Sequence, residues 1–523
     1  MTSVATIPSV AILIGGLPLA SPEAAALRAL RMCQCASLPA QCELNFVEPL
    51  GRFADGDWPS AGSALEVSIK GHESPLFSGQ ITAVEYDYSA DNAVEVRVRG
   101  YDGLHPLRMR RPVRAHIQLT AAELARSLVA DLGINVVNGS SGPIWQRLVQ
   151  HKQTDLEFLA DIAQRSGLYF HLDGTHLKFF TLEGIGPTVP LRLGESLLEA
   201  HIEANAVPCT GTVISIGWNP WRAIERQGRA AFSRCGRQIP TQMSAEAAGG
   251  SGECQLVDEI AQDDLQLESL AQAELDRRAA SEVTFRGIAE GDPRLMPGAI
   301  IDVQGVARML SGQYVVTSVT HTVDQRSGFV SEIGTAAPPP IPRPQGSVIS
   351  VGKVTEVDDP EKLGRVRVVL SAYGDIETDW LQVVIPGAGR DKGMVILPDI
   401  GDQVLLVLPR GDPAQGIVLG GLYGENEPPE SAVSGGAVQR YGIATPGGQR
   451  VRLDAEERTV VVDNGANATI KLAPGALEVR HRSGSAVKLA DQKMSIHAET
   501  DLDIEAPGRT ITIRAKSIEF EQR

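Results

Sequence analysis

The sequence predicts a mainly β protein with a few helices. Its 523 residues include 53 glycines and 32 prolines, which separate many short runs rich in Val and Ile, whereas aromatic residues make up only 5%. β-Branched residues favour strands, and glycine and proline mark the turns between them. At roughly 100 to 200 residues per domain, a chain of this length predicts about three or four domains.

The composition excludes several classes of protein. Charged residues make up 21% and hydrophobic residues 43%, as in an ordinary folded chain. The 48 Lys and Arg residues and 64 Asp and Glu residues give a net charge of −16. The positive surplus that non-specific nucleic-acid binding requires is therefore missing, and we expect no nucleic-acid partner.

The longest uncharged apolar run is VAILIGGLPLA, from Val10 to Ala20. It is about half as long as the ~20 residues that a membrane-spanning helix needs. A signal peptide usually has Lys or Arg before its apolar run, and neither residue precedes this one. We interpret the run as the first strand and turn of the fold and expect no transmembrane segment.

Proline-rich and low-complexity stretches divide the chain. AAPPPIPRPQG carries five prolines, which stiffen the backbone and remove hydrogen-bond donors. ENEPPESAVSGG makes a second break. The predicted domains are residues 1–336, 346–428 and 436–523, joined by linkers at 337–345 and 429–435. Residues 244–253, SAEAAGGSGE, form either a flexible connection or a partner-binding loop.

Residues 1–336 mix strands with helices that are marked by their caps. Thr120 with Glu123, and Thr154 with Glu157, are spaced as capping boxes, and each is followed by apolar residues at helical intervals. Gly133 and Gly167 provide the left-handed residues that end such helices. A third helix is expected around 267–275.

Two groups of side chains are candidate metal ligands. His171 and His176 flank Asp173-Gly174, and a two-residue turn there would place them opposite each other as a solvated cross-strand pair. Cys33, Cys35 and Cys42 are spaced to bind zinc or to pack as small hydrophobic residues, and the second alternative fits better. With six cysteines and no CxxC pair, the chain suits a reducing compartment, and we expect no metal site.

Residues 346–428 contain six short apolar runs that read as strands. A small barrel of the oligonucleotide/oligosaccharide-binding (OB) type is the natural candidate for them. The runs are SVISVGKVTEV, GRVRVVL, WLQVVIP, GMVILP, QVLLVLP and GIVLGGL.

Residues 436–523 have the most informative periodicity. Nine apolar pairs, each two residues apart, recur every seven to ten residues with turn signals between them. They are 451/453, 460/462, 470/472, 477/479, 487/489, 494/496, 502/504, 511/513 and 518/520. Each strand offers about two apolar residues to a core, so this ribbon must coil as a solenoid or wind with other chains.

Familiar catalytic motifs are absent. The chain has no HExxH, GxSxG, Walker-type GxxxxGK[ST] or GxGxxG sequence. A pair of carboxylates for glycoside hydrolysis is not excluded among 64 acidic residues, but no pair stands out. We therefore predict no catalytic residue and no cofactor.

The barrel segment resembles the OB domain of the VgrG and phage-baseplate spike family. The shared elements are Leu363-Gly364-Arg365-Val366, Trp380, Ala388-Gly389 with Gly393, the PDIGDQV run from Pro398, Gly411-Asp412-Pro413 and the final Tyr423. Residues 1–336 are similar to the hub half of this family in FSGQITAVEYDYS, VRVRGYDGLHPLRMRRP, QHKQTDLEFLADIAQRSGLYFHLDG and LMPGAIIDVQG with SGQYVVTSVTH. The resemblance covers nearly the whole chain.

The resemblance implies a non-enzymatic, homotrimeric hub and spike of a contractile injection system. Hub β-barrels would join a hexameric inner tube and baseplate proteins, and residues 436–523 would wind with two other copies into a β-prism. The predicted trimer-axis core is Leu472, Val479, Leu489, Ile496, Ile504, Ile513 and Ile518. Assembly in the bacterial cytoplasm as part of a phage tail-like particle is expected, with the target membrane met only by mechanical puncture.

The resemblance also implies partners that the chain lacks. By comparison with this family, we expect no lysozyme domain between barrel and prism and no toxin domain after the prism, so any effector cargo would be a separate protein. A PAAR-like tip protein is expected to cap the prism. One alternative is a cell-wall hydrolase with a cryptic site in the N-terminal region. Another is an OB barrel that binds oligonucleotide or saccharide, which the net charge of −16 and the five Trp residues disfavour.

Overall fold

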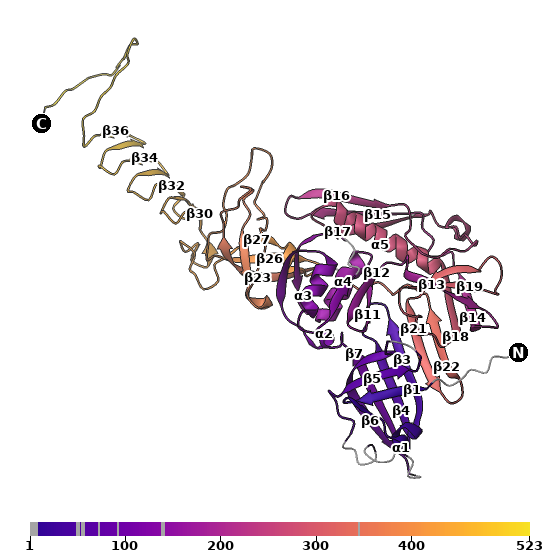
Figure 1. The fold of residues 1–523 in the computed structure, drawn as a ribbon. Coiled ribbons are helices and arrows are strands. Elements are labelled where there is room, and N and C mark those ends of the chain that lie inside the picture. The colour runs from indigo at the N-terminus through magenta and orange to yellow at the C-terminus, as the bar shows by residue number, and fades with distance from the viewer. Residues whose placement is uncertain are drawn as a thin grey trace. The chain divides into compact units, whose positions relative to one another are not determined.

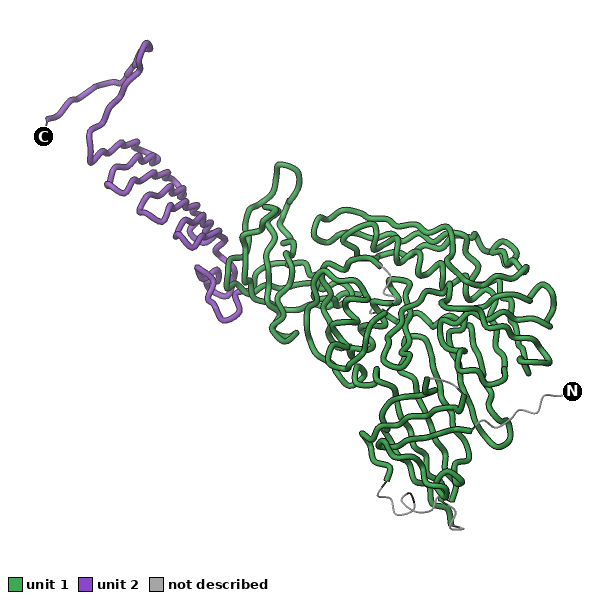
Figure 2. The backbone as a smooth tube through the Cα atoms, viewed as in Figure 1, with its two compact units in different colours: residues 1–422 green, residues 423–523 purple. Residues whose placement is uncertain are grey.

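The computed structural model describes residues 9–48, 53, 58–71, 74–90, 94–137, 142–343 and 346–522. These residues form two compact units, 1–422 and 423–523, shown in green and purple in Figure 2. The expected mainly β fold with few helices is confirmed (Figure 1). Among the described residues, no helix is both long and apolar enough to cross a membrane.

One large sheet organises the N-terminal region, residues 9–336. Its 11 strands run in the order β14 (Leu197–Ala204), β18 (Val283–Glu290), β22 (Gly328–Gly334), β21 (Ser318–Asp324), β3 (Leu27–Cys35), β4 (Gln41–Val47), β7 (Val94–Asp102), β6 (Phe77–Tyr88), β5 (Ala64–Ile69), β1 (Val10–Ile14) and β2 (Leu17–Pro18). The apolar run at 10–20 is the predicted strand and turn, since β1 pairs with β2. β14 and β2 remain edges, so this region has one curled sheet in place of the expected closed barrels.

The sheet joins segments that are distant in the sequence. β21 pairs antiparallel with β3, and His321 lies opposite Met32. Only 1% of the His321 surface is exposed. Its Nε2 donates to the carbonyl oxygen of Leu295 at 3.1 Å, so Nδ1 accepts from the Ser331 hydroxyl at 2.9 Å. Burial lowers the pKa of His321 to about 4 and keeps the ring neutral.

The burial of His321 predicts a pH-dependent stability. An exposed histidine has a pKa of about 6.5, so the unfolded chain binds the proton first as the pH falls. The stability due to neutral His321 is complete above about pH 6.5 and is lost as the pH falls toward 4. A second buried histidine, His171, contributes a slope of the same sign. We therefore expect His321→Gln to reduce the slope of the melting temperature against pH in this range, and the exposed His176→Gln to leave the slope unchanged. Asp102, whose pKa burial raises to about 7, gives the opposite slope, so the difference from wild type is the quantity to measure. A His321→Gln curve parallel to that of the wild type would contradict the assignment.

The predicted helices are present with their caps. In α3 (Ala121–Val129), Glu123 N donates to Thr120 Oγ1 at 3.3 Å and Thr120 N donates to Glu123 Oε2 at 2.8 Å. α4 (Asp155–Arg165) repeats this box with Thr154 and Glu157, and α5 (Asp264–Glu282) begins after Asp263. α4 ends beside left-handed Gly167 as predicted. α3 ends at Val129, before Gly133, so that helix is shorter than predicted.

Smaller sheets and helices complete the N-terminal region. The sheets are β8 (Arg114–Leu119) with β10 (Trp145–Gln150); β9 (Asn135–Val137), β12 (His176–Phe180) and β11 (Tyr169–Asp173); β13 (Ile185–Arg192), β19 (Ala299–Gln304) and β20 (Gly312–Val315); and β16 (Ile224–Ala230), β15 (Thr212–Asn219) and β17 (Glu253–Ile260). The short helices are α1 (Ser21–Ala26), α2 (Pro106–Met109) and η2 (Glu246–Ala248), the last inside the stretch 244–253.

The histidine prediction at the β11–β12 hairpin is wrong. The turn lies at Gly174-Thr175, so His171 pairs with Lys178 and His176 pairs with Asp173. His171 is only 3% exposed and not solvated, and burial lowers its pKa to about 4. A shift of the turn by one residue moves the register by two, and sequence pattern alone does not distinguish the two turns.

The cysteines are all free thiols. Cys42 is buried as predicted, and burial raises the pKa of its thiol. Cys33 and Cys35 are only half-buried, and Cys33 Sγ lies 3.4 Å from Thr320 Oγ1. Within the described residues, no group of three or more His, Cys, Asp or Glu side chains is placed to hold a metal ion.

Residues 346–422 form the barrel, whose five strands are ordered β25 (Ile376–Glu377), β24 (Arg367–Leu370), β23 (Ser347–Glu356), β26 (Gln403–Pro409) and β27 (Ile417–Leu422). The short helices η3 (Ser371–Tyr373) and η4 (Pro413–Gln415) connect them. Its buried core includes Val354, Val368, Leu406, Leu408 and Val418.

Two of the six predicted barrel strands are absent. WLQVVIP makes only isolated bridges, Val366 with Leu381 and Val383 with Val418, which span the gap between the two edges of the sheet. GMVILP has no strand partner in the described chain, and the unpredicted β25 is present. An apolar run becomes a strand only where a neighbouring backbone completes its ladder.

The second unit is dominated by a seven-stranded antiparallel meander, which we call the ladder. Its strands are β30 (Arg440–Ala444), β31 (Arg450–Asp454), β32 (Thr459–Asp463), β33 (Thr469–Ala473), β34 (Ala476–Arg480), β35 (Ala486–Ala490) and β36 (Lys493–His497). The small hairpin of β28 (Val433–Ser434) and β29 (Ala437–Val438) precedes it.

Six of the nine predicted strand pairs lie in the ladder, and β30 adds a strand that was not predicted. The pairs at 502/504, 511/513 and 518/520 form no strand in the described chain, which corrects the sequence prediction. The ladder stops at β36, and in the part of the chain that the structure describes the residues after it pair with no neighbouring strand.

Candidate functional site: the apolar ladder face and the junction between barrel and N-terminal region

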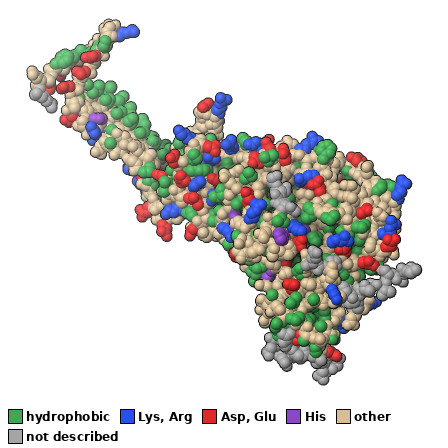
Figure 3. All heavy atoms as spheres, in the orientation of Figure 1, with side chains coloured by type: hydrophobic (Ala, Val, Ile, Leu, Met, Phe, Trp, Pro, Cys, Tyr) green, Lys and Arg blue, Asp and Glu red, His purple; other side chains and the backbone are tan. Residues whose placement is uncertain are grey.

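One face of the ladder carries two continuous apolar columns. Cross-strand register sets residues of successive strands directly opposite each other. The first column is Tyr441, Leu453, Val460, Leu472, Leu477, Leu489 and Met494, and the second is Ile443, Val451, Val462, Ile470, Val479, Val487 and Ile496. Figure 3 shows them as a green stripe along this unit.

The ladder face is uncovered. Exposed fractions of its side chains include 46% for Leu472, 42% for Val479, 41% for Leu489 and 55% for Ile496. Soluble proteins rarely leave so continuous an apolar surface open, and such surfaces mark interaction sites. The ladder face is therefore a candidate binding surface.

The predicted core residues divide into two groups. Leu472 and Leu489 lie in the first column, and Val479 and Ile496 lie in the second. Ile504, Ile513 and Ile518, with exposed fractions of 66%, 68% and 51%, follow the ladder and are in no strand. Tyr441 and Ile443 were missed, although their spacing of two residues is the same signal.

The opposite face of the ladder is polar. Arg452, Lys471, Glu478, Lys488 and Ser495 follow one another there across the strands, interrupted by Val461. Glu478 accepts from the Arg480 guanidinium at 2.7 Å, which lowers the pKa of this carboxyl. One face of the ladder is thus polar and suited to solvent, and the other is apolar and suited to an apolar partner.

A buried ion pair fixes the loop of the barrel that meets the N-terminal region. Arg365 Nη2 lies 2.7 Å from Asp359 Oδ1, and Arg365 Nε donates to Asp359 Oδ2 at 3.0 Å. Both residues are 5% exposed. Asp359 also accepts from the backbone N–H of Leu363 at 2.8 Å. The Arg365 guanidinium holds the pKa of Asp359 well below its usual range.

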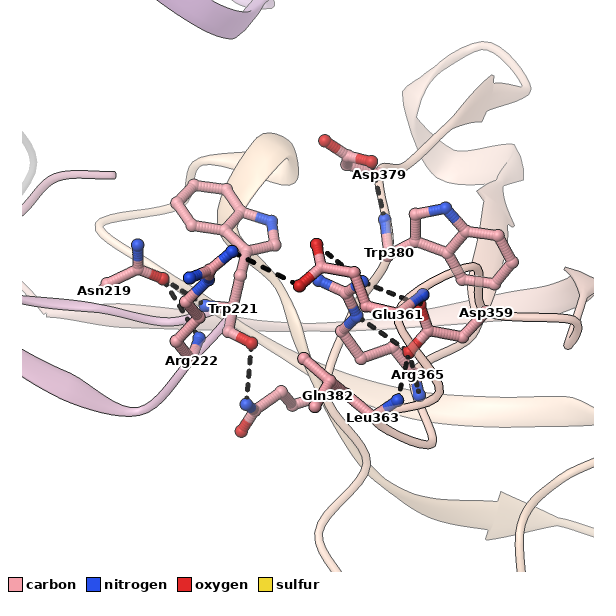
Figure 4. Close-up of polar contacts among 10 residues, drawn as sticks. All are labelled: Asn219, Trp221, Arg222, Asp359, Glu361, Leu363, Arg365, Asp379, Trp380 and Gln382. Atoms are coloured by element: carbon pink, nitrogen blue, oxygen red, sulfur yellow. Dashed lines mark hydrogen bonds and ion pairs between the residues drawn. The ribbon is translucent and has the colours of Figure 1, made fainter. Parts of the chain in front are cut away.

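The N-terminal region reaches this loop through the turn after β15 (Figure 4). Asn219 shapes the turn, because its side-chain oxygen accepts from Trp221 N at 2.9 Å and Arg222 N at 3.0 Å. The turn then presents the Trp221 carbonyl oxygen to Gln382 Nε2 at 2.8 Å. Arg222 lies 3.3 Å from Glu361, which also contacts Arg365 at 3.3 Å.

A second set of contacts comes from β17, the strand that pairs with β15. Glu259, at the end of β17, lies 2.9 Å from Arg410 of the barrel and 3.2 Å from Arg343 of the linker. Burial lowers the pKa of Arg343 to about 10. The linker is also fastened to α4, since Ile341 N donates to Gln164 Oε1 at 2.7 Å. A cavity of about 380 Å³ lies among these elements.

The side chains at the junction between barrel and N-terminal region form structural contacts between the two. The arginines there face carboxylates, and the amides complete hydrogen bonds of turns and linkers. The LGRV motif contains Arg365, but nothing in the sequence indicated Asn219, Glu259 or Arg410. Glu259 and Arg410 are 151 residues apart along the chain, so no local spacing could reveal their pairing. Asn219 bonds locally to Trp221 and Arg222, but the turn that it shapes meets Gln382, which is 161 residues from Trp221.

Two family models match the chain. Residues 350–423 match the type VI secretion system/phage-baseplate injector OB domain. Residues 57–325 match a model described as the Alg8 N-terminal domain.

Curated relatives match over parts of their length. The chain is 23% identical over 373 residues to the actin cross-linking toxin VgrG1 of Vibrio cholerae, covering 62% of this chain and 33% of that protein. It is 29% identical over 184 residues to the type VI secretion system spike protein VgrG2a of Pseudomonas aeruginosa, covering 29% of this chain and 21% of that protein. The matches thus span a third or less of these relatives.

Solved structures share the fold at low sequence identity. The E. coli c3393 protein, described as a type VI secretion component similar to the T4 tail proteins gp27 and gp5, matches with a TM-score of 0.51 at 15% identity, over 79% of this chain and 99% of that one. A chain of the lidded Francisella PdpA-VgrG complex matches with a TM-score of 0.51 at 9% identity, over 94% of this chain and 80% of that one.

Proposed function

The chain belongs to the VgrG and phage-baseplate spike family, and from this premise we propose that it is the non-enzymatic central hub and spike of a contractile injection system. Residues 57–325 belong as well to the family described as the Alg8 N-terminal domain, a description that names no activity. In this proposal residues 1–336 are the hub, 346–428 the OB barrel and 436–523 the spike.

The open ladder face carries the proposal. Two apolar columns along seven strands have no cover within the second unit, and three copies wound together would bury them in one dry axis. The same winding gives residues 498–522 neighbouring backbones, so that Ile504, Ile513 and Ile518 would extend the axis as a β-prism. Intertwined strands leave few open edges and make a stiff rod.

The junction supports a mechanical role. A puncturing rod has to pass force from hub to spike without slipping. The ion pair of Glu259 with Arg410 and the hydrogen bond from Gln382 to the Trp221 carbonyl oxygen join barrel and hub. Force transmission needs rigidity and no bond-making chemistry. The absence of a recognisable nucleophile motif agrees with this role.

The partners follow from the same assembly. The hub would face a hexameric inner tube and baseplate proteins, and the similar Francisella structure is itself a complex of a VgrG with a second protein, PdpA. A PAAR-like tip protein would cap the spike, and effector cargo would be a separate chain. The particle would assemble in the bacterial cytoplasm and meet the target membrane by puncture alone.

The test uses the full chain as bait in the cells that make it. We expect negatively stained pull-downs to contain tail-like particles, and deletion of residues 436–523 to leave the chain folded but the particles without a tip. A cell-wall hydrolase is the alternative. Turnover of purified peptidoglycan that is lost on a point substitution in the N-terminal region, with no particle in the pull-down, would contradict the proposal.

A further inference from the structure

The barrel carries an apolar segment that has no partner in its own chain. Residues 394–397, Met-Val-Ile-Leu, have exposed fractions of 44%, 90%, 52% and 40%. In the described chain, Val395, Ile396 and Leu397 make no backbone–backbone hydrogen bond. Backbone groups that no strand has paired can still form a ladder with another backbone.

The segment is held away from the barrel core. It follows a tight turn in which Gly389 and Lys392 bridge, and the loop projects beyond β26 and β27 in Figure 1. At its C-terminal end the segment approaches the barrel at Gly364. A Cβ atom built on this glycine would lie 3.7 Å from Leu397 Cδ1. The loop therefore presents an extended apolar strip from a fixed base.

The same barrel has an apolar sheet face that is also open. β23, β26 and β27 turn one set of side chains into the core and another set outward. In the outward set, the exposed Lys353 lies opposite Gln403 toward one end, and six further side chains form an apolar patch. We call it the outer face, and it consists of Ile349, Val351, Leu405, Val407, Ile417 and Leu419. Ile349 is 65% exposed, Val351 46% and Leu419 42%.

We propose that segment 394–397 of one copy packs on the outer face of the barrel of a second copy. Segment 394–397 and the six side chains of the outer face are all apolar, so each can bury the other from water. Every barrel carries one segment and one outer face. Such a contact is head-to-tail, so every copy donates one segment and accepts another. Three such contacts close into a ring when the rotation between copies is one third of a turn.

A second copy is the occupant because of where the barrel sits in the chain. Only residues 423–439 separate β27 from the first strand of the ladder. If three ladders wind together, they tether three barrels at high effective concentration, whereas an unrelated strand would have to bind from solution. This inference rests on the proposed trimeric spike. The barrel contact then adds an interface at a different part of the chain.

Cysteine cross-linking of full-length chains tests the contact. One chain carries Val395→Cys, and a differently tagged chain carries Ile349→Cys. The native cysteines all lie between residues 33 and 254, so the wild type reports their background. After co-expression and mild oxidation, we expect a covalent dimer of the two tags. A chain that carries both substitutions should give covalent species up to the trimer.

The matched control replaces Val395→Cys by Asp391→Cys, in the same loop with its side chain 93% exposed but outside the apolar segment. We expect its yield of cross-linked product to be at least tenfold lower. A Val395–Ile349 yield no higher than the control, or a cross-link only to a different protein, would overturn the inference. Light scattering of the same samples separates the two proposals. A trimer without the cross-link counts against the barrel contact alone, and a folded monomer counts against the trimeric spike as well.

Discussion

The Leu489→Asp variant of the full chain is expected to be monomeric in light scattering, where the wild type is expected to be trimeric. Leu489 lies in the first column of the ladder face, so a wound trimer would bring three aspartates to one dry axis. Burying an unpaired charge costs several kcal/mol for each ion. Because Leu489 is 41% exposed in the single chain, the ladder itself should remain folded.

Ser495→Asp is the matched control for this variant. Ser495 lies on the polar face, opposite Lys488 of the neighbouring strand, so the same new charge stays in water. We expect Ser495→Asp to remain trimeric. A trimeric Leu489→Asp variant, or a wild type that is a folded monomer, would favour a ladder that works as a single-chain ribbon and would contradict the β-prism.

Removal of the Arg365 guanidinium should destabilise the barrel strongly. Asp359 is only 5% exposed, so Arg365→Met leaves its carboxylate buried without a cation. Removing one partner of a buried ion pair in this way lowers the free energy of unfolding by about 3–5 kcal/mol. The loss is measured as faster hydrogen exchange of β24 and β26 peptides at pH 7. An exposed aspartate has a pKa of about 3.9 and folding lowers the pKa of Asp359, so the wild-type advantage is present above about pH 4 and is lost as the pH falls further.

Arg222→Met is the comparison for the barrel variant. It removes only the ion pair with Glu361, whose two side chains are 57% and 48% exposed. Pairs of this kind contribute about 0–1 kcal/mol. If Arg365→Met and Arg222→Met change barrel exchange equally, the pair of Arg365 with Asp359 does not hold the loop as we infer.

Local patterns in the sequence were sufficient for the helices and most of the ladder. The Thr120 and Thr154 capping boxes fix helix starts through bonds that span three residues. The ladder pairs follow from alternation at two-residue intervals with turns between them. Both signals are contained within a few residues, so they can be recognised without knowing what the rest of the chain does.

The sequence by itself determined the mainly β class, the capped helices, the ladder strands as far as 494/496 and a resemblance that named the family. Only the tertiary structure decided that β21 joins β3 in one curled sheet, that His171 is buried, and that Glu259 meets Arg410. It also left 394–397 and 502–520 without strand partners in the described chain. The physical reason is the same in each case. A cap or an alternating run is satisfied by near neighbours, whereas a ladder bond, a buried ring or an ion pair needs a group whose position depends on how the whole chain, or another chain, is arranged.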